Sequence, residues 1–187
     1  MVANLLAGYA HIDALIAEGV DVFAMGSHKH LLELNTLVLC GTDEARRQLY
    51  AGHAHSTEQR FYEQAGGGIR AVVEWYGRHP DRSPWRRAAG VYIRILSRPQ
   101  LFIEGNHRTG ALVMSYLLVR GGLPPFVLSS EIAAGYFDPS TRIQNTDKGS
   151  AITMLRFPRL ERHLADLLRT HADPALLRHH DAPPPAS

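Results

Sequence analysis

The sequence predicts an all-α fold, a helical bundle built around one central buried helix. Apolar residues recur at three- and four-residue spacing along most of the chain, and glycine or proline follows most of these segments. The chain shows no alternation of strand and helix signals and no internal repeat. Its 187 residues suit one domain, and a hydrophobic content of 45% is enough for a real core.

The first part of the chain contains helix signals and one ambiguous polar segment. Helices are expected at residues 4–19, 30–40 and 43–49, the last one capped by Thr42, with a connection over 20–30. Residues 51–63 are polar throughout, which is typical of a loop or a short β-hairpin. A small hairpin at this place would be the one exception to an all-helical architecture.

Besides the central helix, three further helices are expected after residue 68. Residues 69–78 carry apolar side chains at positions i, i+3, i+4 and i+7. Residues 84–97 follow Ser83, a good N-cap residue, and begin with a proline, which suits the first helical position. A last helix should span about 150–170, where Pro158 is expected to kink or divide it.

Residues 98–122 form the stretch around which the chain is organised. An apolar entry leads to the acid Glu104, a Gly105–Asn106 turn, two basic residues and a long apolar run. The run predicts a helix over about 107–120 that is apolar nearly all round and therefore central and buried. A loop that turns into a helix in this way suits a phosphate, because free backbone N–H groups and the helix dipole favour an anion.

With these residues in place, the chain resembles the Fic/Doc (Fido) family, whose signature is His-Pro-Phe-x-Asp/Glu-Gly-Asn-x-Arg. The residues that match in register are Phe102, Glu104, Gly105, Asn106, Arg108 and Thr109. The resemblance places a Fic-like domain at 28–172, preceded by an N-terminal helix and connection at 1–27. The proline-rich end of the chain predicts a disordered tail at 173–187. The alternative for the motif itself is an ordinary helix start with a capping turn and a surface arginine.

The resemblance implies a protein that binds ATP or another nucleotide with Mg²⁺ and transfers part of it, most often AMP, to a protein hydroxyl. Glu104 would hold Mg²⁺, for which a carboxylate oxygen is a suitable ligand. Arg108 would grip phosphate with its forked N–H donors and act in the transfer. The expected phosphate-binding residues are Gly105, Asn106, His107, Arg108 and Thr109.

The chain departs from the signature at the position of the catalytic base. Gln100 stands where the family has its histidine, and glutamine has no pKa that would let it act as a general base. Loss of a base costs on the order of 10²- to 10⁴-fold in rate. His107 occupies a variable motif position and is a poor replacement. Two hypotheses follow: a divergent transferase with its base elsewhere, or an inactive Fic-fold module that binds or regulates.

The expected partner is a protein. In the family a β-hairpin flap docks the target segment, and residues 54–62 stand in that position, with an ordinary surface loop as the alternative. The family's inhibitory helix motif has no convincing copy here. A net charge of +2 is too small to indicate nucleic-acid binding, and no apolar run reaches the roughly 18 residues of a membrane span. The oligomeric state is not predicted.

Other residues suggest weaker possibilities. Two histidine pairs, His28 with His30 and His53 with His55, have the spacing of metal ligands, although solvated loop histidines are the favoured interpretation. The three glycines at 66–68 favour a flexible linker over a phosphate loop. The single cysteine and the absence of a signal-peptide pattern indicate a cytoplasmic protein.

Overall fold

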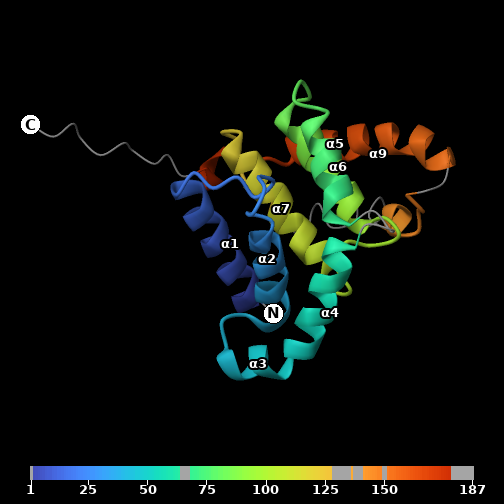
Figure 1. Cartoon of the computed structure of the whole chain (residues 1–187). Coiled ribbons are helices and arrows are strands. Elements are labelled where there is room, and N and C mark those ends of the chain that lie inside the picture. The colour runs from blue at the N-terminus through green and yellow to red at the C-terminus, as the bar shows by residue number, and fades with distance from the viewer. Residues whose placement is uncertain (1, 64–67, 128–135, 137–140, 149–150, 178–187) are drawn as a thin grey trace, which may run out of the picture.

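The computed structural model describes residues 2–63, 68–127, 136, 141–148 and 151–177. Within these residues the structure is almost entirely helical, which confirms the predicted fold class (Figure 1). The helices are α1 Val2–Ala17, α2 Lys29–Cys40, α3 Glu44–Leu49, α4 Ala51–Tyr62, α5 Ile69–Gly77, α6 Pro84–Leu96, α7 Asn106–Arg120 and α9 Ala151–Thr170, followed by a short 3-10 turn at Pro174–Leu176. An isolated parallel bridge pairs Arg98 with Asp147.

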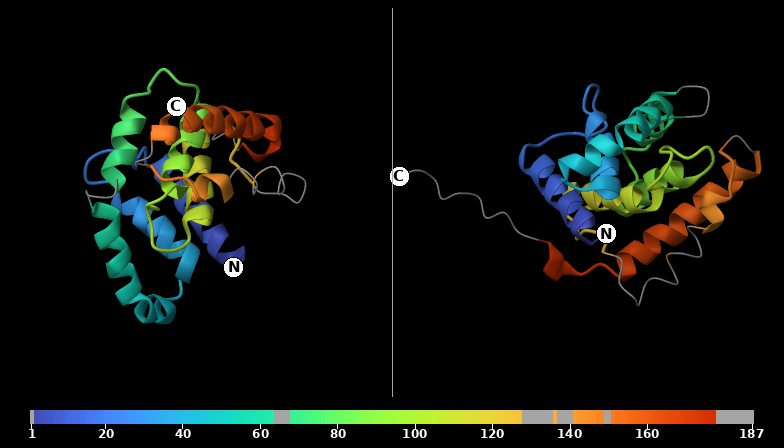
Figure 2. Two further views of the ribbon diagram at one scale, coloured as in Figure 1. Left: turned by 90° about the vertical axis from the view of Figure 1, so that its right-hand side faces the viewer. Right: turned by 90° about the horizontal axis from the view of Figure 1, so that it is seen from below.

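Helix α7 is the centre of the bundle, as its uniformly apolar sequence predicted. It packs against α6 on one side and against α1 and α2 on the other, and α9 packs on α6 (Figures 1 and 2). Most of its residues are buried, from Asn106 at its first turn to Leu118 near its end. Since the N-terminus of α7 carries the Glu-Gly-Asn motif, the best-buried helix of the described structure also positions the candidate site.

The helix boundaries follow the local signals. The Ser83 hydroxyl accepts a hydrogen bond from the backbone N–H of Arg86 at 3.4 Å, and Pro84 begins α6. At α3 the cap is Asp43, whose carboxylate accepts from the Arg46 backbone N–H at 3.2 Å, and not the Thr42 that was predicted. Aspartate one position later satisfies the same free N–H groups.

The prediction of a loop or hairpin at 51–63 is wrong, because these residues form α4. Only Thr57 and Phe61 of this helix are buried, one turn apart. Two buried positions give a weak apolar period, so the polar face dominated the sequence pattern. The segment 54–62 is therefore helical and does not form the hairpin flap that the family resemblance implied.

The C-terminal helix α9 is continuous through Pro158 and is not divided there. The disordered tail was predicted from residue 173, but the 3-10 turn Pro174–Leu176 lies within it, and the rest of the tail from 178 onward lies outside the described residues. Two of the three glycines at 66–68 also lie outside them. Of the helices that the structure describes, none has both the length and the apolar character needed to cross a bilayer.

Candidate functional site

The loop between α6 and α7 is closed by the side chain of Asn106. Its Oδ1 accepts a hydrogen bond from the Phe102 backbone N–H at 2.9 Å, and its Nδ2 donates to the Phe102 carbonyl at 2.8 Å and to Gln100 Oε1 at 3.3 Å. Asn106 is only 4% exposed. Its side chain is thus fully used in shaping the loop, and what it offers a ligand is its backbone N–H.

Helix α7 begins with its first turn open. Gly105 is the N-cap residue, has left-handed backbone angles (φ 77°, ψ 8°) and provides no side chain, and none of the described side chains caps the turn. The first intrahelical bond shown runs from the Thr109 N–H to the Gly105 carbonyl at 2.9 Å. The N–H groups at the start of a helix have no intrahelical acceptor, so this turn is suited to receive an anion.

Asn35 of α2 supports this turn through two hydrogen bonds. No role for this residue was predicted from the sequence. Its Nδ2 donates to the Glu104 carbonyl at 2.9 Å and to the Thr109 hydroxyl at 3.0 Å. Both Asn35 and Thr109 are buried, so the Thr109 side chain lies in the interior and supports the loop. The available signal was an asparagine among leucines in the 30–40 segment, where a buried amide needs partners.

The side chain of the motif residue Arg108 reaches the C-terminal part of α2. Its Nη1 donates to the Val38 carbonyl at 3.2 Å, and the residue is half-buried. A guanidinium has five N–H donors in a planar fork. One hydrogen bond to α2 therefore leaves donors that an anion at the α7 N-terminus can use.

The ring of His107 faces α6. Its Nδ1 lies 3.2 Å from the Tyr92 hydroxyl, and its Nε2 lies 3.4 Å from Gln144 Oε1. The imidazole is held on both nitrogens by neighbouring polar groups. Its remaining contribution to an anion site is the backbone N–H of the first turn of α7.

Gln100, at the position of the family histidine, is engaged at both ends of its amide. Its Nε2 donates to the Leu96 carbonyl at 3.2 Å, while its Oε1 accepts from Asn106. Its backbone carbonyl accepts from Arg60 Nε of α4 at 2.9 Å. Gln100 thus joins the end of α6, the motif loop and α4, which is a structural role that needs no ionisation.

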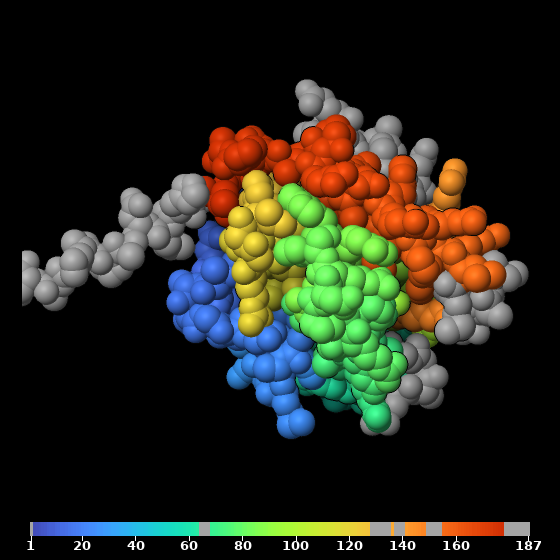
Figure 3. All heavy atoms as spheres, turned by 90° about the horizontal axis from the view of Figure 1, so that it is seen from above, coloured from blue at the N-terminus to red at the C-terminus, as the bar shows by residue number. Residues whose placement is uncertain are grey.

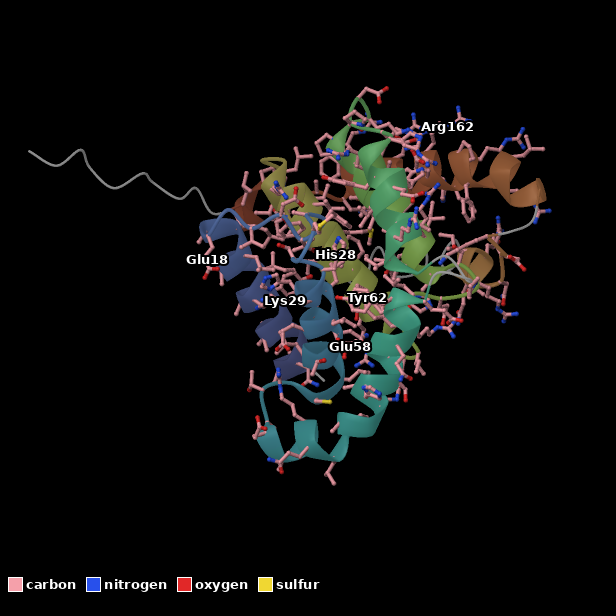
Figure 4. All side chains as sticks on the ribbon, viewed as in Figure 1. Glu18, His28, Lys29, Glu58, Tyr62 and Arg162 are labelled. Atoms are coloured by element: carbon pink, nitrogen blue, oxygen red, sulfur yellow. The ribbon has the colours of Figure 1, made fainter. Side chains whose placement is uncertain are left out.

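One hollow borders the motif, and another reaches Asn35, which supports the motif loop. One, of about 580 Å³, is lined by Arg60, Arg98, Pro99, Gln100, Phe102, Ile103, Gln144 and Asp147. The other, of about 470 Å³, lies between α2, α3 and α4, with Lys29 on α2 and Glu58 on α4 among its wall residues (Figure 4). Asn35, although buried, is among the residues that line this second hollow.

The metal-binding prediction depends on Glu104 alone. Its side chain is exposed next to the open turn of α7. Mg²⁺ is commonly held by one or two carboxylates together with substrate phosphates and water, so a single acid fits this ion when a nucleotide is bound. For the histidine pairs there is no support, because the described residues contain no cluster of three potential metal ligands.

Comparison with known proteins supports the resemblance. The chain is 28% identical over 116 residues to protein adenylyltransferase fic-1 of Caenorhabditis elegans. It is therefore similar to a Fic-type protein. The match covers 57% of this chain but only 22% of the relative, so the chain spans about a fifth of that protein. No family model and no solved structure matches the chain.

Proposed function

We propose that this chain is a Fic-type protein that binds a nucleotide with Mg²⁺ and holds its phosphates at the N-terminus of α7. The observation that carries the proposal is the open first turn after the left-handed Gly105, with the exposed Glu104 beside it. Free N–H groups and the positive end of the helix dipole favour an anion.

Each residue has a role that its position allows. Phosphate oxygens accept hydrogen bonds from the first-turn N–H groups of α7, and Arg108 adds charge-assisted bonds from its free donors. Glu104 holds Mg²⁺, which neutralises phosphate charge when it is bound. Asn35 keeps the Glu104 backbone in place through the 2.9 Å bond to its carbonyl.

The hydrogen bonds of Gln100 favour a protein that binds a nucleotide over one that transfers part of it. The amide of Gln100 cannot take a proton from a hydroxyl, and both of its polar ends are bonded within the loop. A binding or regulatory module therefore agrees with what this residue does, which is to close the loop.

A second candidate function is nucleotidyl transfer to a protein hydroxyl, with the base supplied by another residue or by the target. Similarity to an adenylyltransferase favours it. In that case the target docks near residues 54–62 of α4, since Arg60 of this helix bonds to Gln100. Nucleotidyl transfer depends mainly on positioning and charge neutralisation, which the motif is suited to provide.

Thermal unfolding with and without ATP and Mg²⁺ tests the binding proposal. A ligand present at 100 times its Kd stabilises by about 2.7 kcal/mol, and a protein of this size gains about 2 to 4 °C per kcal/mol. Glu104→Ala and Arg108→Ala should reduce the shift. Glu18→Ala and Arg70→Ala, exposed residues remote from the motif, serve as matched controls (Glu18 in Figure 4). A shift that survives both motif substitutions contradicts the proposal.

Transfer of label from ATP separates the two candidates. A binding module labels no protein in a lysate, whereas a transferase labels one, and Glu104→Ala abolishes the labelling. Gln100→His restores the family base at its position, and labelling by this variant alone would show that the nucleotide site is intact and that only the base is missing.

A further inference from the structure

A third cavity lies where α5, α6 and α9 meet. Its volume is about 380 Å³. Helix α9 packs along α6, and the space-filling view shows α9 beside the segment of α5 and α6 from above (Figure 3). Its lining includes aromatic rings and cationic side chains, and none of these residues belongs to the motif.

Two cations of this cavity donate hydrogen bonds to backbone carbonyls. Arg94 of α6 donates from Nη1 to the Gly90 carbonyl at 2.9 Å, and its guanidinium lies 3.9 Å from the centre of the Trp75 ring. Lys148 donates from Nζ to the Pro99 carbonyl at 2.7 Å. Within the described part of the chain, neither side chain forms an ion pair. Both side chains are half-buried. Partial burial of a charge without a counterion is unfavourable, so such positions favour an anionic ligand.

Glu161, the carboxylate that lines the cavity, already forms ion pairs with two arginines. Glu161 of α9 is 2% exposed and pairs with Arg82 and, at 3.0 Å, with Arg86. Its single negative charge thus offsets the positive charges of two arginines at one side of the cavity. The charges of Arg94 and Lys148 remain in excess, and burial together with Arg94 and Arg60 lowers the pKa of Lys148 to about 8.

Lys148 is fixed in place by the backbone. The Lys148 N–H donates to the Arg98 carbonyl at 2.8 Å, and the Arg98 N–H donates to the Thr146 carbonyl at 2.9 Å. This bridge anchors the segment 146–148 to the entry of the motif loop. The ammonium group therefore lines the cavity from a defined position.

Part of the cavity lining is apolar and aromatic. Trp75 of α5 and Phe157 of α9 both line the cavity, and the Arg94 guanidinium lies 5.5 Å from the Phe157 ring centre. Gly90 of α6 permits this arrangement, because a Cβ at that position would overlap the Trp75 ring. A ligand with an apolar body can pack here while its charged end reaches the cations.

We propose that this cavity is a binding site for a small organic anion, an oxyanion carried on an apolar or aromatic body. The oxyanion binds between Arg94 and Lys148, and the body packs against Trp75 and Phe157. The site is separate from the nucleotide site at α7 and does not depend on it.

Tryptophan fluorescence provides the test. The chain has two tryptophans, so Trp85→Phe leaves Trp75 as the reporter inside the cavity. Phenyl phosphate should change the emission of this variant saturably. Inorganic phosphate, which lacks the body, and phenol, which lacks the charge, should bind at least tenfold more weakly. Absence of saturable binding by phenyl phosphate overturns the proposal.

Substitutions in the same background locate the site. Arg94→Met and Lys148→Met should each raise the Kd for phenyl phosphate roughly 10- to 100-fold, the range for loss of a charged hydrogen bond. Arg94→Lys keeps the charge and should retain part of the affinity. Arg70→Met removes an exposed α5 arginine and should have no effect. Unchanged affinity in both Met variants, or loss of binding in Arg108→Ala, contradicts the assignment.

Discussion

The side-chain amide of Asn35 on α2 donates a hydrogen bond of 2.9 Å to the backbone carbonyl of Glu104, 69 residues further along the chain. The same nitrogen donates to Thr109 at 3.0 Å. One buried amide therefore joins α2, the motif loop and the first turns of α7. The carboxylate proposed to hold Mg²⁺ owes its position to a residue outside the motif.

Asn35→Ala should weaken both the fold and the nucleotide site. Removal of the amide leaves a buried carbonyl and a buried hydroxyl without their donor, which costs about 1 to 3 kcal/mol. Urea unfolding measures this loss, and the ATP-dependent thermal shift should fall as well. Gln48→Ala, at an exposed position of α3, is the control and should change neither quantity. An unaltered thermal shift in Asn35→Ala would argue against the role of this residue at the site.

Gly105→Ala should destabilise the protein by about 1 to 2 kcal/mol, because an L-residue is strained at φ 77°. The added Cβ would also lie 3.0 Å from Asn35 Nδ2 and disturb its bonds. Gly52→Ala is the matched control, since Gly52 is helical, exposed and has open space around its Cβ position. That substitution should be neutral or stabilising by up to about 1 kcal/mol. Equal effects of the two substitutions, measured by urea unfolding, would contradict the strained-turn account.

Glu161→Gln should cost about 3 to 5 kcal/mol, the range for breaking a buried ion pair. Glu161 is 2% exposed and compensates Arg82 and Arg86, which would remain close together without it. Asp166→Asn breaks an exposed pair with Arg169 on the same helix and should have little effect. Thermal unfolding of the two variants under identical conditions compares their losses of stability.

Lys148 should make stability increase with pH above about 8. Its pKa is lowered from 10.5 to about 8 in the folded state, so the unfolded chain binds more protons between these values. Below pH 8 both states are protonated and the cost of the buried charge is fully present. The charged and titratable groups around it are Arg60, His79, Arg82, Arg94 and Glu161.

Unfolding of Lys148→Met measures this contribution by difference. Between pH 7 and 9.5 the wild-type protein should gain stability relative to the variant as the pH rises. A constant difference across this range would show that the folded ammonium titrates as it does in the unfolded chain.

Much of the fold was predictable because the strongest local signals agree with the tertiary structure. The apolar run after Asn106 indicated a buried central helix, and α7 is that helix. Ser83 and Pro84 marked the start of α6 correctly. In both helices, one short segment contained both the helix-forming residues and the apolar pattern that indicates burial.

The remaining features of the fold and of the site depend on contacts between residues that are distant in the sequence. Helix α4 buries only Thr57 and Phe61, and Phe61 stacks on Phe102 with ring centres 5.6 Å apart, a contact that no local pattern shows. The motif residues were identified from their spacing, but the supporting bond from Asn35 and the bonded state of Gln100 required the packed structure. The cavity at Arg94 likewise forms only when α5, α6 and α9 meet.

The most direct test of the account is the response of the backbone amides at the start of α7 to ATP and Mg²⁺, followed by ¹H–¹⁵N NMR. The largest shifts should occur at the amides of Gly105, Asn106, His107 and Arg108 and should saturate with ATP, whereas the amides of α3 should not move. If the amides at 105–108 remained unchanged at millimolar ATP and Mg²⁺, the phosphate site would not be at this helix N-terminus.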